Sequence, residues 1–260
     1  DTPPGVDEGA GTLTFTVSLS NPSAFPIGVC YIDVPGTATP LLDYTPVAPG
    51  GPCLPPFNTV SFAAGVTSQP IVVPILEDAW DEADEVFGMN LTGPAPGSSP
   101  VGPGVIAGTG TILDNDATPQ ITLSDPIAAV AETGGPTLTF TATLDVASSF
   151  PVTVDCATQD GTALAGEDYV GGSAAPCFTF APGTTGPQTI NVLVLDDTMW
   201  EPTNPQTFNL NLSNPVNATI FDGLATGTIN DDELQPTMSI NSVTQSEGTT
   251  PMTFTVTLTG

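Results

Sequence analysis

Apolar and polar residues alternate along many short stretches of this chain. In residues 13–19, Leu, Phe, Val and Leu are separated by Thr and Ser, the period-two pattern of a strand with one buried face. Similar alternation occurs at 27–31, 71–75, 87–91 and 105–113, with Pro- and Gly-rich clusters between these stretches. About seven short strands in roughly 115 residues predict an all-β fold, an immunoglobulin-like antiparallel β-sandwich.

The strand pattern belongs to an internal repeat. The stretch 13–19 recurs at 138–144 and again at 252–258 with the same order of apolar and hydroxyl residues. The corresponding phenylalanines, Phe15 and Phe140, lie 125 residues apart. A repeat of this length indicates tandem copies of one domain.

We predict two full copies and part of a third. Residues 1–117 form repeat 1, residues 118–233 form repeat 2, and residues 234–260 are the opening strands of an incomplete third repeat. Repeat 1 lacks the first strand that residues 120–123 and 237–240 supply to the later copies. A sandwich with a missing strand can accept one from a neighbour, so we expect strand exchange between subunits. The alternative is that the sequence is a piece of a longer tandem chain.

The charge composition restricts what these copies can bind. The chain has 28 Asp and Glu and no Lys, Arg or His, which gives a formal net charge of −28 at pH 7. Nucleic acids and anionic membranes require a basic surface, so neither is an expected partner. The imidazole and amine groups of most catalytic sites are also missing, which argues against an enzyme. No apolar run approaches the length of a membrane span, so we expect no direct membrane insertion.

The acidic residues of repeat 1 gather at one end of the predicted sandwich. Alternate strands run away from the end at which Glu8 lies, and the strands between them return to it with the acidic clusters. The turns at the opposite end, near 20–25, 63–69 and 93–104, contain no acid. The carboxylates predicted at the acidic end are Glu8, Asp43, Glu77, Asp78, Glu82, Glu85, Asp114 and Asp116.

Carboxylates at this density need a counter-charge that the chain does not contain. Two of them about 4 Å apart repel by roughly 4 kcal/mol at an effective dielectric of about 20. Many oxygen ligands on flexible loops suit Ca²⁺ better than Mg²⁺ or Zn²⁺. We therefore predict a calcium site in repeat 1, the alternative being a solvated acidic rim with condensed sodium ions.

Repeat 2 has acidic residues at most, but not all, of the matching positions. Gln206 stands where repeat 1 has Glu85, and the loop after Asp197 is longer than its counterpart. We therefore expect a weaker calcium site in this copy. Its predicted ligands are Glu132, Asp168, Asp196, Asp197, Glu201, Asp231 and Asp232.

The four cysteines fall into two pairs with similar spacing. Cys30 and Cys53 are 23 residues apart, and Cys156 and Cys177 are 21 apart. Four cysteines allow three connectivities, but these spacings favour one local disulfide in each repeat; four reduced, buried thiols are the alternative. Disulfides predict an extracellular or cell-surface location. A one-residue shift between the copies places Cys156 toward the core and Cys30 on the outward face of its strand, so we expect bridges on different sides.

Several short motifs recur in a fixed order within each copy. In repeat 1 they are Glu-Gly at 8–9, Gly-Thr-Ala at 36–38, Asp-Tyr at 43–44, the acidic segment 75–87 and Ile-Leu-Asp-Asn-Asp at 112–116. This combination resembles the Calx-β domain of sodium–calcium exchanger regulatory regions and of large surface proteins. The resemblance implies that the eight acids of repeat 1 ligate Ca²⁺ together with the backbone carbonyl of Trp80. Asn115 departs from an acid often found in the family, and Gln206 stands where the family has an acid.

These observations predict a non-enzymatic extracellular structural module. We expect calcium-stiffened tandem repeats of a surface or filament protein that contact neighbouring repeats or self-associate, with the ion site at the junction between repeats. One alternative is a calcium-sensing regulatory domain of a transporter, which would have reduced cysteines. Another is an adhesin or carbohydrate-binding accessory module, which needs exposed aromatic residues. Trp80 and Trp200 both fall at the acidic end, where a structural role is favoured, and no particular protein or glycan partner is indicated.

Overall fold

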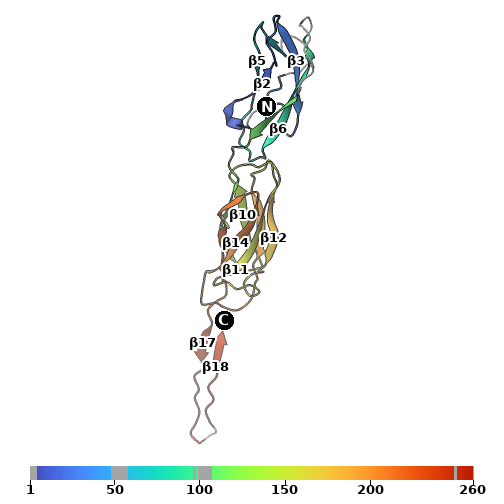
Figure 1. Cartoon of the computed structure of the whole chain (residues 1–260). Coiled ribbons are helices and arrows are strands. Elements are labelled where there is room, and N and C mark those ends of the chain that lie inside the picture. The colour runs from blue at the N-terminus through green and yellow to red at the C-terminus, as the bar shows by residue number, and fades with distance from the viewer. Residues whose placement is uncertain (1–4, 48–57, 96–97, 99–106, 249–250, 260) are drawn as a thin grey trace. The chain divides into compact units, whose positions relative to one another are not determined.

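The computed structural model describes residues 5–47, 58–95, 98, 107–248 and 251–259 (Figure 1). The chain divides into two compact units, Asp1–Ala117 and Thr118–Gly260. Within the described residues every regular element is a strand, apart from the short 3-10 helix η1 at Glu8–Ala10. None of these residues form a helix of the length and apolarity that crossing a bilayer takes.

Unit 1 is a sandwich of two sheets. The larger sheet has the strand order β1-β7-β6-β3-β4, and β2 pairs with β5 to form the second layer. Leu13 and Phe15 from β2 pack against Phe87 and Ile112 from the larger sheet in one apolar core. The strands are β1 Val6–Asp7, β2 Thr12–Ser18, β3 Ile27–Pro35, β4 Thr59–Phe62, β5 Ser68–Pro74, β6 Glu85–Pro94 and β7 Ala107–Leu113.

Unit 2 repeats this sandwich and adds a hairpin. One sheet has the order β12-β11-β14-β16-β9 and the other the order β13-β10-β8-β15, while β17 and β18 form a two-stranded sheet of their own among the described residues. β11, β12 and β14 are drawn side by side in Figure 1. The strands are β8 Gln120–Ser124, β9 Val130–Ala131, β10 Thr137–Leu144, β11 Val152–Asp160, β12 Ser173–Phe180, β13 Gln188–Leu193, β14 Gln206–Val216, β15 Thr219–Asp222, β16 Leu224–Asn230, β17 Thr237–Ile240 and β18 Val256–Thr259.

These sandwiches confirm the predicted all-β, immunoglobulin-like class, with one difference in strand pairing. The sheets are not purely antiparallel, because β1 pairs in parallel with β7, β9 with β16, and β8 with β15. β1 and β9 lie just before the first long strand of their unit. Their parallel pairing therefore brings the segment before that strand beside the last long strand of the same unit.

The Gly-Thr-Ala motif of each copy holds a bend in the chain against the neighbouring strand. A Cβ atom at Gly36 would overlap the carbonyl oxygen of Val86. The next residue, Thr37, accepts a hydrogen bond at Oγ1 from the Val86 N–H at 2.8 Å. Residues 161–163 make the same contacts with Thr207. The motif recurs because the close backbone approach requires glycine, and it supplies no carboxylate.

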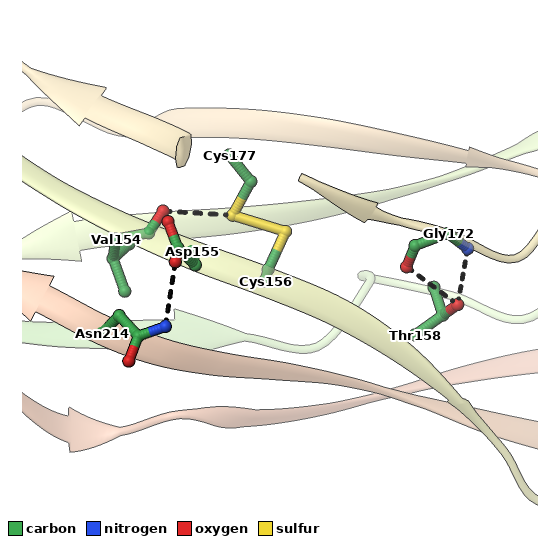
Figure 2. Close-up of a disulfide and its surroundings, with 7 residues drawn as sticks. All are labelled: Val154, Asp155, Cys156, Thr158, Gly172, Cys177 and Asn214. Atoms are coloured by element: carbon green, nitrogen blue, oxygen red, sulfur yellow. Dashed lines mark hydrogen bonds between the residues drawn. A yellow bond between two sulfur atoms is a disulfide. The ribbon is translucent and has the colours of Figure 1, made fainter. Parts of the chain in front are cut away.

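A disulfide joins Cys156 on β11 to Cys177 on the neighbouring strand β12 (Figure 2). The two Cα atoms are 5.8 Å apart. Cys156 is buried within the core of unit 2, which confirms the predicted pairing and its inward direction. In unit 1, Cys30 lies on the strand face opposite the core residue Val29 and is itself fully buried. Cys53 is outside the described residues, so the Cys30–Cys53 bridge stays a prediction.

Loss of the Cys156–Cys177 bridge should lower the free energy of unfolding of unit 2. Closure of a loop with a sequence separation of 21 residues contributes about 3 kcal/mol in the chain-entropy model. Denaturant unfolding of the double variant Cys156→Ala/Cys177→Ala measures this loss. The matched control is Thr179→Ala at an exposed site on the same strand, with an expected change below about 0.5 kcal/mol. Equal midpoints for the two variants would contradict the prediction.

Candidate metal centre

The parallel edge pairs position the central carboxylates of both units. The register pairs the last residue of β1 with the last residue of β7, so the next residues, Glu8 and Asp114, lie side by side. β9 and β16 have the same register, which places Glu132 beside Asp231. Glu8 is only 7% exposed and Glu132 only 1%. Such burial is rare for an acid and requires a compensating partner.

Two further segments of unit 1 bring acids to the same place. The carbonyl of Asp43 accepts a hydrogen bond from the Leu76 N–H at 2.9 Å, which holds Asp43 beside the acidic segment that follows. Glu85 begins β6 directly opposite Ile112 near the end of β7. The segments that carry Asp43 and Glu85 therefore both lead to the space next to Glu8.

Carboxylate oxygens in unit 1 form two groups of three. Within each group, one oxygen from every residue lies within 4.8 Å of the others. The groups are Glu8 with Asp114 and Asp116, and Asp43 with Glu82 and Glu85. Six of the eight predicted residues are thus brought together in close groups.

Glu77 and Asp78 lie next to these groups without joining them. The Glu77 carboxylate reaches Gly9, where a Cβ would lie 3.1 Å from Glu77 Oε2. Asp78 Oδ1 accepts a hydrogen bond from the Trp80 N–H at 2.8 Å. This bond closes a turn that fixes the loop at Trp80, the residue whose carbonyl the family resemblance nominates as a ligand.

Unit 2 holds three such groups, and one predicted acid is outside them. Asp168 instead accepts a hydrogen bond at Oδ2 from the Leu164 N–H at 2.6 Å. Glu233 belongs to two of the groups although it was absent from the predicted ligands. The groups are Glu132 with Asp197 and Glu233, Glu132 with Glu201 and Asp231, and Asp196 with Asp232 and Glu233.

A signal for Glu233 was present in the repeat. The Gly-Thr-Ile segments at 110–112 and 227–229 align without a gap, and this alignment carries Asp116 onto Glu233. The prediction stopped one residue earlier, at Asp232, because only the Asp pair was matched to the first copy. The register of β7 and β16 determines the equivalence, since each strand ends immediately before its acids.

Each unit has one carboxylate group that the other unit lacks. Unit 1 has Glu85 where unit 2 has Gln206, so the group containing Asp43 has no equivalent in unit 2. Conversely, unit 2 has Asp232 where unit 1 has Asn115, and only unit 2 has a group built on Asp232. Repeat 2 therefore lacks a carboxylate at Gln206 but has an additional one at Asp232. Its weaker affinity for calcium stays a prediction.

Several buried carboxylate oxygens in these groups have no hydrogen-bond partner in the part of the chain that the structure describes. In unit 1 they are Glu8 Oε2 and Asp116 Oδ2. In unit 2 they include Glu132 Oε1, Glu201 Oε2 and Asp231 Oδ1. Buried polar atoms without partners are costly. Converging carboxylate oxygens of this kind are the donor set that Ca²⁺ accepts, so the residues fit this ion.

Burial and mutual repulsion raise the pKa values of the central glutamates. Burial, followed by the charge of Asp114, raises the pKa of Glu8 to about 7. Burial and a hydrogen bond with Asp43 raise the pKa of Glu85 to about 8. In unit 2, burial and the charge of Glu201 raise the pKa of Glu132 to about 7. These groups hold protons near neutral pH unless a cation replaces them.

The stabilisation that calcium gives should therefore grow as pH rises. An acid with a raised folded-state pKa binds more protons when folded, so without calcium the free energy of unfolding falls as pH rises from about 4.5 to about 8. Calcium needs ionised ligands, so its stabilisation grows over the same range. Melting temperatures with calcium and with chelator should differ more at about pH 8 than at about pH 5. A difference independent of pH would contradict this linkage.

The fold and site together define a class of protein, the immunoglobulin-like β-sandwich with a carboxylate cluster where its strands end. The chain belongs to the Calx-beta domain family, whose model matches residues 1–116 and again residues 114–233. This match confirms the resemblance drawn from the short motifs.

Similar proteins include one from the extracellular matrix. The chain is 33% identical over 172 residues to extracellular matrix protein 3 of Lytechinus variegatus, a match that covers 64% of this chain and only 5% of that protein. Among solved structures, the apo form of the Calx CBD1 domain is 27% identical with a TM-score of 0.39, covering 45% of this chain and all of that one. CBD12 from CALX1.2 is 18% identical with a TM-score of 0.37, covering 87% and 97%.

Proposed function

We propose that the chain is a non-enzymatic, extracellular structural module in which Ca²⁺ stiffens the tandem repeats of a surface or filament protein. The observation that carries this proposal is the set of buried carboxylate oxygens without protein partners around Glu8 and Glu132. No residue of the chain carries a basic side chain that can neutralise them. A divalent cation supplies both the missing charge and the missing coordination.

The residues that would hold the ion in unit 1 are the two groups around Glu8 and Asp43. In unit 2 they are the three groups around Glu132, Asp196 and Glu233. The last acids of unit 1 immediately precede the boundary at Ala117. Binding there would tie the start of the sandwich to its end and restrict the segment leading to the next repeat.

The disulfide supports an extracellular module over a cytosolic calcium sensor. Cys156 and Cys177 are joined in the core of unit 2, and persistent disulfides are rare in reducing compartments. The similarity to extracellular matrix protein 3 is in keeping with this location. Recovery of both cysteines as free thiols from the native source would favour the sensor instead.

Calcium should raise the melting temperature of both units and lengthen the particle in solution. At a free calcium concentration about 100 times Kd, one site stabilises its unit by about 2.7 kcal/mol. Calorimetry and small-angle scattering with calcium, with magnesium and with chelator measure both effects. An unchanged melting temperature and unchanged particle dimensions would refute the proposal. An equal effect of magnesium would show that cations only screen the carboxylate charges in a general way.

A further inference from the structure

The two units differ at one edge of the sandwich, the edge formed by β5 in unit 1 and by β13 in unit 2. Among the described residues, β13 pairs only with β10 and β5 pairs only with β2. The register aligns the two strands, because Ile71 lies opposite Phe15 and Ile190 lies opposite the matching Phe140. The aligned positions are Pro70 with Thr189, Val72 with Asn191, and Pro74 with Leu193.

Alternate residues of β13 point their backbone groups away from β10. The Val194 N–H donates to the carbonyl of the residue before β10 at 2.8 Å. The Leu193 carbonyl points the other way and accepts a hydrogen bond from the Val170 N–H at 2.8 Å. Backbone groups alternate in direction along a strand. Thr189 and Asn191 therefore direct both their N–H and their C=O groups toward the open edge.

In unit 1 the same edge is blocked by proline. The Pro74 carbonyl accepts a hydrogen bond from the Thr45 N–H at 2.9 Å, so Pro74 and Pro70, four residues earlier, both face away from β2. Proline has no N–H to donate and is a common means of preventing an edge strand from pairing. β5 therefore cannot accept a further strand, whereas β13 carries donors and acceptors for one.

Burial and charge also favour a contact at β13. Ile190 is only half-buried, although the matching Ile71 is 4% exposed. Another strand beside β13 would cover the remaining part of the Ile190 side chain. Residues 169–195 contain no Asp or Glu, in a chain whose formal net charge is −28. The edge is therefore a place where two copies of this chain can meet without bringing carboxylates together.

We propose that β13 pairs with β13 of a second copy of the chain, antiparallel and about a two-fold axis at Ile190. Thr189 then lies opposite Asn191 of the second copy, and each exchanges both backbone hydrogen bonds with the other. The two Ile190 side chains meet at the axis. The same surface is used by both copies, so the contact closes as a dimer. This lateral contact goes beyond the proposed function and uses none of the carboxylate groups.

The ends of the paired segment explain why a second copy fits this edge. In this register Leu193 lies opposite Pro187 of the second copy, and the Leu193 N–H donates to the Pro187 carbonyl. The Leu193 carbonyl already accepts a bond from Val170, and Pro187 has no N–H to offer it. The two missing groups therefore face each other, and no backbone donor at this edge is left without an acceptor.

Disulfide trapping with two singly substituted full-length chains tests the register. Thr189→Cys in one chain and Asn191→Cys in the other place the thiols directly opposite each other, with Cα atoms about 5.5 Å apart. After mild oxidation, the mixture should yield a covalent dimer in much higher amount than either chain alone, because identical positions lie diagonally, about 7–8 Å apart. Val72→Cys, 48% exposed on the blocked edge of unit 1, replaces Asn191→Cys as control, and cross-linking should fall at least about tenfold.

Sedimentation velocity at increasing protein concentration tests the contact without new cysteines. At about 0.15 M salt, where charges more than about 8 Å apart are screened, the wild-type chain should dimerise. Thr189→Pro should abolish the dimer, because it introduces the proline that unit 1 has at this position and removes an edge-facing N–H. Thr189→Val retains the N–H and should retain the dimer, and melting of both variants checks that unit 2 stays folded.

A wild-type chain that stays monomeric, a dimer that survives Thr189→Pro in folded protein, or equal trapping by Val72→Cys would overturn the strand pairing. Calcium and chelator should leave the dimer unchanged, since no carboxylate takes part. The same samples separate this contact from the proposed function. A calcium shift in melting temperature without a dimer removes only the β13 contact, and a dimer without a calcium shift removes only the calcium-stiffened module.

Discussion

Replacing Glu132 with Gln should remove most of the calcium-dependent stabilisation of unit 2 and, without calcium at pH 8, should make that unit more stable than the wild type. Glu132 is 1% exposed and belongs to two of the three carboxylate groups. Its amide would supply one oxygen without a charge, which weakens a cation site. At about 100 times Kd the expected loss approaches 2.7 kcal/mol.

The gain in the calcium-free state has a separate cause. Burial and the neighbouring acids raise the pKa of Glu132 to about 7, so ionisation at pH 8 opposes folding. A neutral Gln removes that opposition. The two stability curves, measured by denaturant unfolding against calcium concentration, should therefore cross.

Glu167→Gln is the matched control for this experiment. Glu167 is an exposed glutamate of the same unit and belongs to none of the carboxylate groups formed by the described residues. Its variant should follow the wild type within about 0.5 kcal/mol with and without calcium. Parallel curves for Glu132→Gln and Glu167→Gln would show that the group around Glu132 binds no calcium.

Phe208→Ala should destabilise unit 2 by about 3–5 kcal/mol. The Phe208 ring is fully buried, stacks on Tyr169 at a centroid distance of 4.0 Å and meets Phe140 edge-on at 5.9 Å. Gly227 lies against the same ring, since a Cβ there would be 2.6 Å from Phe208 Cε1. Truncation therefore leaves a cavity bounded by strands of both sheets.

Denaturant unfolding of Phe208→Ala measures this loss, with Phe221→Ala as the control. Phe221 is 75% exposed, so its truncation should cost less than about 0.5 kcal/mol. The equivalent ring in unit 1, Phe87, stacks on Tyr44 at 4.3 Å, and its truncation should act on that unit alone. A change below about 1 kcal/mol for Phe208→Ala would contradict the assigned core.

Much of the acidic end was predictable because it follows from chain direction. Strands that alternate in direction return to the same end of a sandwich, so acids placed after every returning strand must meet there. This reasoning placed Glu8 and Asp114 at the same end of the sandwich before any register was known. It missed Glu233 because the prediction matched acid types between the copies instead of counting from the shared Gly-Thr-Ile segment.

Other motifs could be seen in the sequence, but their physical role could not. Gly-Thr-Ala recurs in both copies, yet only the structure shows that Gly36 is required by the approach of the Val86 carbonyl. Cys30 was expected on the outward face of its strand, and the structure shows that Cys30 is nevertheless fully buried. Both features depend on contacts between segments that are distant in the chain.

The repeat, the all-β class and the end of the sandwich at which the acids gather could all be predicted from the sequence. These properties depend on local periodicity and on the order of strands, both of which can be read along the chain. Contacts between distant segments set which carboxylates come within 4.8 Å of one another and which oxygens are buried without a partner among the described residues. The physical reason is register: the parallel pairing of β1 with β7 and of β9 with β16 sets Glu8 beside Asp114 and Glu132 beside Asp231, and a shift of one residue would separate them.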